Sequence, residues 1–176
     1  MIEINSKTTQ KFCELAAKEL KGDWVILGGS VMVLLGVKER FTVDIDLAGP
    51  TTSTQADTLK LMTIAEKIGL APEAINQAGA FFLNRIPNWK DNLVPIIKKK
   101  DFSLSRPNSF LFLQLKIARL SESDFGDCIN MLKLEPVTPK QSQVLKGILE
   151  RSIKSSKESN EFRERCRLLL EKLKSI

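Results

Sequence analysis

The amino-acid sequence predicts an α+β protein whose C-terminal part is entirely helical. Two patterns support this fold class. Up to about residue 106, short apolar runs of strand length alternate with helical segments, and glycines and prolines separate them. From Asn108 onward, the apolar residues recur with the spacing of helices. We therefore divide the 176 residues into an α/β core, residues 1–106, and a helical region, residues 107–176, which we expect to pack on that core.

Helices and strands alternate through the first half of the chain. The expected opening elements are a helix with Phe12, Leu15, Ala16 and Leu20 on one face, capped by Thr8 and ended by Gly22, and a strand, Trp24–Leu27. After the turn Gly28-Gly29-Ser30 we expect a helix, Val31–Leu35, a strand, Phe41–Leu47, closed by Gly49-Pro50, and a helix, Ser53–Ile68, with Ala56, Leu59, Met62 and Ala65 inward.

Prolines punctuate the middle of the chain, and capping residues mark the helices that follow. The strand-like runs are Ala80–Ile86, Leu93–Ile97 and Phe102–Leu104. The predicted caps are Asn108 for a helix through Leu120, Ser121 or Ser123 for one through Lys133, and Thr138-Pro139 for one with Leu145, Ile148 and Ile153. The last helix is indicated by Phe162, Cys166, Leu169 and Leu170.

The amino-acid composition excludes several classes of protein. A hydrophobic share of 43% with 27% charged residues is typical of a globular chain that buries a core. The longest apolar run, Val31–Leu35, is far shorter than the roughly 18 residues of a membrane span, and the N-terminus does not resemble a signal peptide. Cys13, Cys128 and Cys166 are odd in number and widely spaced, so we expect reduced thiols, a cytoplasmic location and no membrane partner.

The chain contains no histidine. This absence excludes Ser-His-Asp and Cys-His catalysis, His-ligated zinc and a histidine general base. Any catalysis must therefore depend on carboxylates, lysine, hydroxyl groups or a metal ion held by oxygen atoms. The formal net charge of +6 favours polyanionic partners such as nucleic acid or nucleotides.

Two acidic residues, Asp44 and Asp46, lie on the strand that follows the glycine turn. Because strand side chains alternate, both point to one face, with Cα atoms roughly 6.6 Å apart. The two carboxylates repel each other unless a cation lies between them. Mg²⁺ (or Mn²⁺) prefers such hard oxygen ligands. The Gly28-Gly29-Ser30 turn lets the backbone approach a phosphate, and the next helix offers unpaired N–H groups. A phosphate cradle beside such a metal site is what phosphoryl transfer requires.

The segment VILGGSVMVLLGVKERFTVDIDL resembles the nucleotidyltransferase superfamily, whose signature is a strand, Gly-(Gly/Ser)-Ser, a helix and Asp-x-(Asp/Glu). It is most similar to a bacterial branch that contains the AbiEii and MenT toxins of toxin–antitoxin systems. IPNWKDNLVPI and RPNSFLFLQLKIARLSESDFGDCINML continue the resemblance, which covers roughly residues 24–133. It implies a small mixed β-sheet flanked by helices, magnesium, a nucleoside triphosphate substrate and a cognate antitoxin as a protein partner.

The same branch carries a Lys and a later Asp-x-x-Asp on a helix pair, and Lys116, Asp124 and Asp127 match these positions. The resemblance implies that Lys116 contacts the triphosphate. Asp127 is the better candidate for a functional acid than Asp124, because it lies deeper in its helix. Asp124 is alternatively a first-turn acid favoured by the helix dipole. Arg119 shares a helix face with Lys116 and is a second candidate for nucleotide binding. We expect Lys116 to be exposed and to contribute little to stability.

Other charged residues have two interpretations each. Arg40 contacts phosphate or is a surface residue. Many superfamily members carry a third carboxylate on a later strand as the base, and the only strand-adjacent acids here are Asp91 and Asp101. Lys98-Lys99-Lys100 and the basic C-terminal helices are solvated segments or a surface for RNA phosphates. With few aromatic residues and no tyrosine, sequence-specific recognition of single strands is not indicated.

Three functions remain open from the sequence. The first is a toxin-like nucleotidyltransferase that moves a nucleoside monophosphate from a nucleoside triphosphate to a hydroxyl of RNA, with the tRNA 3′ end as the acceptor that the resemblance suggests. The second keeps this chemistry with a small-molecule or protein hydroxyl as acceptor. The third is a catalytically degenerate module that binds nucleotides or RNA. The intact Asp44 and Asp46 favour an enzyme.

Overall fold

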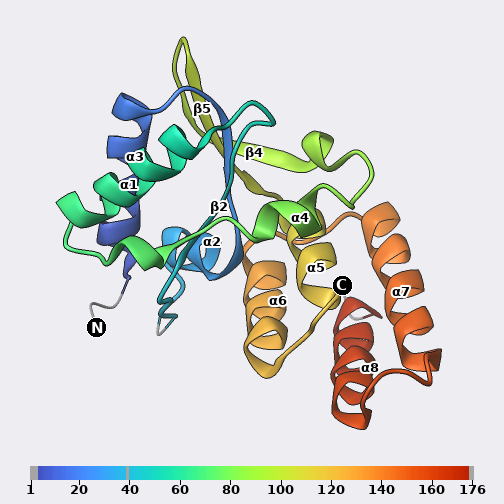
Figure 1. The fold of residues 1–176 in the computed structure, drawn as a ribbon. Coiled ribbons are helices and arrows are strands. Elements are labelled where there is room, and N and C mark those ends of the chain that lie inside the picture. The colour runs from blue at the N-terminus through green and yellow to red at the C-terminus, as the bar shows by residue number, and fades with distance from the viewer. Residues whose placement is uncertain (1–3, 39, 175–176) are drawn as a thin grey trace. The chain divides into compact units, whose positions relative to one another are not determined.

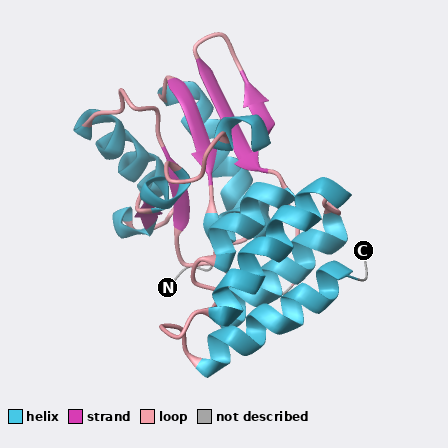
Figure 2. Ribbon diagram, turned by 90° about the vertical axis from the view of Figure 1, so that its right-hand side faces the viewer, coloured by secondary structure: helices cyan, strands magenta, loops and turns pink. Residues whose placement is uncertain are grey.

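The computed structural model describes residues 4–38 and 40–174, and the chain divides into two compact units (Figure 1). The first unit is Met1–Pro107 and the second is Asn108–Ile176. All strands found in the described residues belong to the first unit, whereas the second unit is helical (Figure 2). The protein therefore has the α+β class predicted from the sequence.

A mixed five-stranded sheet, counted over the described residues, forms the centre of the first unit. In the order β3-β2-β1-β5-β4, its strands are β3 (Ile75–Asn76), β2 (Ile45–Ala48), β1 (Gly22–Ile26), β5 (Phe102–Pro107) and β4 (Leu93–Lys98). β1 runs parallel to β5 and antiparallel to β2. β3 is parallel to β2, and β4 is antiparallel to β5. The central β1 consists mainly of buried apolar residues, as expected for a strand covered on both faces.

Helices and short 3₁₀ turns connect these strands. They are α1 (Ser6–Glu19), α2 (Gly28–Leu34), α3 (Gln55–Lys67), η1 (Pro72–Ala74), α4 (Gly79–Leu83) and η2 (Trp89–Asn92). α1 and α3 lie side by side in Figure 1, and Lys67 Nζ is 2.7 Å from Glu19 Oε1 between them. The cap of α1 is Asn5, whose side chain accepts the Thr8 N–H, and not Thr8 as predicted. Asn5 is the better cap because its oxygen reaches the unpaired N–H three residues on.

Two further predictions about the first unit are wrong. Ala80–Ile86 is not a strand: residues Gly79–Leu83 form α4, and Leu83 anchors this short helix in the core. The Phe81-Phe82 pair favours a strand by propensity, but tertiary packing overrides that weak preference. The inner face of α3 is also different. Of the residues predicted to be inward, Leu59 is 64% exposed and Ala56 is also exposed, whereas Ala65 is buried as predicted. The other buried residues of α3 are Leu61 and Ile64.

The predicted strand Phe41–Leu47 is shorter than expected, since β2 begins at Ile45. The preceding residues leave the sheet, and Thr42 makes only an isolated bridge to Ile4 in the described part of the chain. The Asp44 carbonyl accepts hydrogen bonds from the hydroxyls of Ser30 and Thr42 instead of a ladder bond. This local bonding explains why Asp44 stands just outside the strand.

The second unit consists of α5 (Ser109–Ile117), α6 (Glu122–Leu134), α7 (Pro139–Lys154) and α8 (Asn160–Lys174). The predicted caps Asn108, Ser121 and Thr138 are confirmed, because each side chain accepts an N–H of the first turn. The core of this unit includes Phe112, Met131, Leu145, Leu149, Phe162, Cys166, Leu169 and Leu173. Leu173 takes the inner position predicted for Leu170, which is only partly buried.

The three cysteines are buried and free. Burial raises the pKa of Cys13 to about 12 and that of Cys166 to about 11, so both thiols are neutral at physiological pH. Among the residues that the structure describes, none of the helices has the combination of length and apolar character that a membrane span demands.

Candidate active site at the β1–α2 turn

Gly28 is the first residue of α2, in direct contact with an acidic side chain. The helix thus begins three residues before the predicted Val31, and the Gly28-Gly29-Ser30 turn is its first turn. The φ of Gly28, +57°, lies in the left-handed region, which glycine adopts without strain. A Cβ atom placed on Gly28 would lie 1.9 Å from Asp46 Oδ2. Glycine is therefore required twice, by the backbone conformation and by the carboxylate that occupies the space of a side chain.

Ser30 connects this turn to the acidic segment. Its hydroxyl donates to the Asp44 carbonyl at 2.9 Å and accepts the Asp46 N–H at 3.2 Å. The Thr42 hydroxyl donates to the same Asp44 carbonyl at 3.1 Å. Ser30 is fully buried, so its hydroxyl holds the backbone of Asp44 and Asp46 against α2. Both predicted metal ligands are thus positioned by the predicted glycine-serine turn.

Asn76 is a neighbour of Asp46 that the sequence did not reveal. β3 runs parallel to β2 with Asn76 in register with Asp46, and Asn76 Nδ2 donates to Asp46 Oδ1 at 2.9 Å. The side-chain oxygen Asn76 Oδ1 accepts the Ala78 N–H at 3.0 Å, which fixes the orientation of the side-chain amide. β3 has only two residues, too few for any periodicity, so no pattern could have placed Asn76 beside Asp46.

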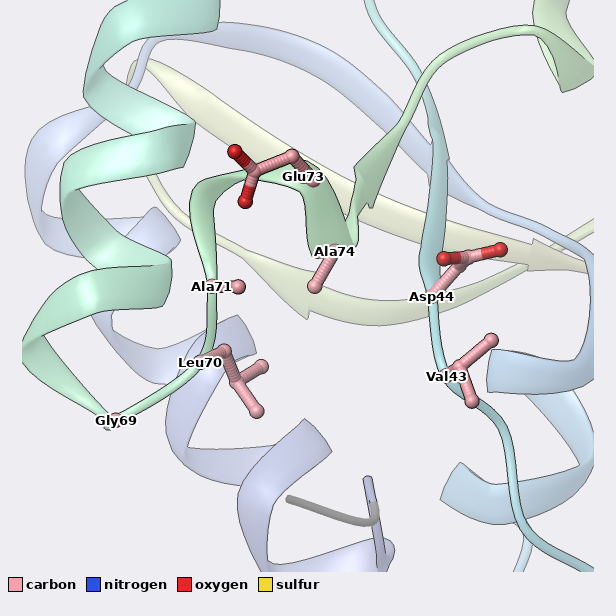
Figure 3. Close-up of a pocket in the computed structure, with 7 residues that line it drawn as sticks. All are labelled: Val43, Asp44, Gly69, Leu70, Ala71, Glu73 and Ala74. Atoms are coloured by element: carbon pink, nitrogen blue, oxygen red, sulfur yellow. The ribbon is translucent and has the colours of Figure 1, made fainter. Parts of the chain in front are cut away.

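Asp44 lines a pocket of about 480 Å³. The other lining residues, drawn in Figure 3, are Val43, Gly69, Leu70, Ala71, Glu73 and Ala74. Figure 3 shows the carboxylates of Asp44 and Glu73 directed away from each other, Glu73 toward α3. Glu73 therefore does not extend the acidic pair, and the pocket beside Asp44 is mainly apolar.

The donor set of this site fits a hard divalent cation. Asp44 and Asp46 offer carboxylate oxygens, the ligands that Mg²⁺ prefers. In the described part of the chain no group of three or more His, Cys, Asp or Glu side chains could hold a metal ion. A cation at Asp44 and Asp46 would therefore need further oxygens from a bound ligand, as is usual for magnesium with phosphates.

Arg40 lies at the same turn. A Cβ on Gly29 would be 2.9 Å from Arg40 Nη2, so the guanidinium lies over the Gly29 backbone. The Arg40 side chain also donates to the Phe41 carbonyl. The structure thus brings together Gly28, Gly29, Ser30, Arg40, Asp44 and Asp46, which the sequence predicted as one site.

Asp101 lies elsewhere. Its carbonyl accepts the N–H of Gly22, the first residue of β1, at 2.8 Å. β1 runs from Gly22 toward Gly28, so Asp101 is at the opposite end of this strand from the acidic pair. The place beside Asp46 on the neighbouring strand belongs to Asn76, an amide without a negative charge.

In the second unit, Lys116 is at the centre of an ion-pair cluster with Arg119, Asp124 and Asp127. Lys116 Nζ is 2.7 Å from Asp124 Oδ1 and 2.9 Å from Asp127 Oδ2. Arg119 binds both oxygens of Asp124, at 2.7 and 2.9 Å. Lys116 is only 8% exposed, which corrects the expectation that it faces solvent. Two positive and two negative side chains balance within this cluster.

Asp124 has a second role in the same cluster. It is the N3 residue of the capping box with Ser121, as the first-turn interpretation of this acid predicted. Burial alone raises the pKa of Asp124, but the hydrogen bonds from Arg119 and Lys116 outweigh it and hold this pKa well below its ordinary range. Asp124 is therefore ionised throughout the physiological range.

Comparison with protein families gives one match. The model of a family described as "Nucleotidyltransferase of unknown function (DUF6036)" matches residues 6–167, which include the β1–α2 turn, the acidic pair and the Lys116 cluster. No curated protein and no solved structure matches the chain.

Proposed function

Because the chain belongs to this DUF6036 family of nucleotidyltransferases, we propose that it is a magnesium-dependent, toxin-like enzyme that transfers a nucleoside monophosphate to RNA. The acceptor hydroxyl attacks the α-phosphorus of a nucleoside triphosphate. A new oxygen–phosphorus bond forms, the bond to the β-phosphate oxygen breaks, and pyrophosphate leaves. The proton of the hydroxyl passes to water. A tRNA 3′ end is the proposed acceptor, the cytoplasm the proposed location, and a cognate antitoxin the proposed protein partner.

The observation that carries this proposal is the contact between Asp46 and Gly28. Because Gly28 has no side chain, the Asp46 carboxylate lies directly against the Gly28-Gly29-Ser30 segment, which the sequence predicts as the phosphate cradle. Asp44 and Asp46 would hold Mg²⁺ (or Mn²⁺) together with oxygens of the triphosphate. Magnesium bound there supplies charge neutralisation for the triphosphate and the leaving pyrophosphate.

The residues of the chain itself have separate tasks in this proposal. Ser30 and Asn76 position the two acids through the hydrogen bonds described above. Arg40, whose guanidinium lies over the Gly29 backbone, would contact a phosphate oxygen bound at this turn. Lys116 and Asp127 match the family pattern, but their mutual pairing and burial support a structural role in the helical unit.

The direct test follows the transferred group. The protein is incubated with magnesium, total RNA and each nucleoside triphosphate in turn, labelled at the α-phosphate. We expect the label in RNA with equal release of pyrophosphate, and none with the variant Asp44→Asn, Asp46→Asn. Glu66→Gln, an exposed acid of α3, is the matched control and should remain active. Label in protein or in small molecules would favour the alternative acceptors, and no label with any triphosphate would favour a binding module.

A further inference from the structure

The short helix α4 exposes two large aromatic side chains next to each other. Phe81 is 56% exposed and Phe82 is 52% exposed, whereas the following Leu83 is buried. The two rings meet edge to face, with centroids 5.4 Å apart. Leu83 anchors the helix in the core, whereas about half of each phenylalanine remains accessible to solvent. Two neighbouring exposed rings are an unusual surface for a soluble unit.

Positive charges lie close to the aromatic rings of α4 and of the following turn η2. The Arg85 guanidinium carbon is 3.9 Å from the centroid of Phe81, and Lys90 Nζ is 5.6 Å from the ring of Trp89. Within residues 79–92, Asp91 is the only acidic residue. Aromatic rings combined with Arg and Lys bind single-stranded nucleic acid, because bases stack on the rings and on guanidinium planes while the cations contact phosphates.

This surface is tied to the acidic pair by short contacts. Asn76 bonds to Asp46 and also accepts the N–H of Ala78, the residue before α4. At the start of α4, a Cβ on Gly79 would be 2.9 Å from Leu27, the neighbour of Gly28. Figure 1 shows α4 beside β2. Five residues separate Asn76 from Phe81, so their Cα atoms are at most about 18 Å apart.

The basic loop expected to bind RNA lies elsewhere. Lys98, Lys99 and Lys100 connect β4 to β5 near Asp101, at the end of β1 opposite Gly28. Lys99 Nζ also donates to the Ala17 carbonyl of α1 at 3.0 Å, so part of this loop serves the fold. Within the first unit, α4 is thus the better-placed surface for a strand that ends at Asp46.

We propose that Phe81, Phe82 and Arg85 form a stacking surface for single-stranded RNA, which we call the α4 surface, and that Lys90, on the next helical turn η2, adds a phosphate contact. The α4 surface holds the acceptor strand so that its terminal hydroxyl reaches the site at Asp44 and Asp46. This inference rests on the proposed function. It concerns base stacking without sequence specificity, so it agrees with a composition that does not indicate sequence-specific recognition. Arg85 and Lys90 favour an RNA strand over a protein partner, because their charges can pair with the phosphates of the strand.

The test measures binding of short fluorescein-labelled oligo(A) and oligo(U) RNA by fluorescence anisotropy, with the full chain. Phe81→Ala, Phe82→Ala should weaken binding at least about tenfold, the effect of losing one stacked base. Phe81→Trp, Phe82→Trp should keep the affinity, because a larger ring also stacks. Leu59→Ala, another exposed apolar residue, is the matched control and should bind RNA like the wild type.

A second readout separates stacking from charge. The phenylalanine variant should keep the slope of log K against log salt concentration. Arg85→Gln, Lys90→Gln should reduce that slope by about 0.7 for each phosphate that the variant no longer neutralises. Both variants should retain magnesium-dependent nucleotide binding, so a failure here is distinct from failure of the proposed function. The inference is overturned if the phenylalanine variant binds RNA like the wild type, or if the wild type binds no RNA at low salt; the latter would indicate a protein-binding surface.

Discussion

At Gly28, the absence of a side chain determines the position of a carboxylate. The Asp46 oxygen occupies the space that a methyl group would fill, and the hydrogen bond from Asn76 holds the other oxygen of the same carboxylate. Each contact restricts one side of the group, which keeps both oxygens of Asp46 near the turn. Even the smallest side chain at Gly28, a methyl group, should therefore be sufficient to disturb the site.

Gly28→Ala tests this contact, with Gly36→Ala as the matched control. Both glycines have positive φ, +57° and +73°, but nothing lies within 4 Å of a Cβ on Gly36. Both substitutions should lower the free energy of unfolding by about 1–2 kcal/mol through backbone strain. Only Gly28→Ala should also displace Asp46 and weaken magnesium-dependent nucleotide binding. Urea unfolding and titration calorimetry measure the two effects, and equal binding losses in both variants would contradict the contact.

The residues of the site differ in how well the sequence predicts them. Gly28, Ser30, Asp44 and Asp46 were identified because their chemistry is confined to two short segments. Asn76 was missed because its position depends on strand pairing between β2 and β3, which joins residues thirty positions apart. Pairing of a two-residue strand is decided by tertiary structure and leaves no local pattern.

Helices α5 and α6 are joined through the buried Lys116. Its ammonium group pairs with Asp124 and Asp127, and all three side chains are nearly inaccessible to water. Removing one partner of a buried ion pair leaves an uncompensated charge, which is strongly unfavourable. The packing of α5 against α6 therefore depends on the positive charge of Lys116. From the sequence, the family resemblance assigns this charge to substrate binding.

Lys116→Met should lower the free energy of unfolding by about 3–5 kcal/mol, because two buried carboxylates lose their shared cation. Lys133→Met removes an exposed lysine of α6 and should change it by less than about 0.5 kcal/mol. Chemical denaturation of both variants measures the difference. Normal stability together with lost nucleotide binding would instead assign Lys116 to the triphosphate.

The lowered pKa of Asp124 predicts acid sensitivity of the helical unit. A carboxyl group whose pKa is lower in the folded state binds protons preferentially when unfolded. Its contribution to stability is complete above the ordinary pKa of about 4 and decreases as the pH falls below it. Arg119→Met removes one cause of the shift, so the acid-induced loss should be smaller in this variant. Urea unfolding followed from neutral to acidic pH measures both profiles, and identical profiles would contradict this origin.

Whole elements were predictable where a local signal marks them. The starts of α5, α6 and α7 follow from Asn108, Ser121 and Thr138, whose side chains cap the first turn. α4 was predicted as a strand because its two phenylalanines favour extended structure, while Leu83 and the close contact of Gly79 with Leu27 place it as a helix. Such contacts are not visible in a short sequence window.

At the scale of the molecule, the charged residues are unevenly distributed. The Lys116 cluster is neutral in itself, so the net charge of +6 arises from the remaining residues. In the first unit, Asp44 and Asp46 lie near the C-terminal end of β1, just before Gly28. Lys98–Lys100 lie near the N-terminal end of the same strand. A cation at the acidic end removes the repulsion between the two carboxylates and a polyanionic substrate.

The most direct test of the central claim is titration calorimetry of nucleoside triphosphate binding, with magnesium and with magnesium removed by a chelator. The wild type should bind at least one nucleoside triphosphate, and only with the metal. Asp44→Asn, Asp46→Asn keeps the shape of both side chains and removes their charge, so this binding should fall about 10–100-fold or more, with an unchanged melting temperature as evidence of folding. Equal binding in the variant and the wild type, or equal binding with and without magnesium, would contradict the assignment of the site.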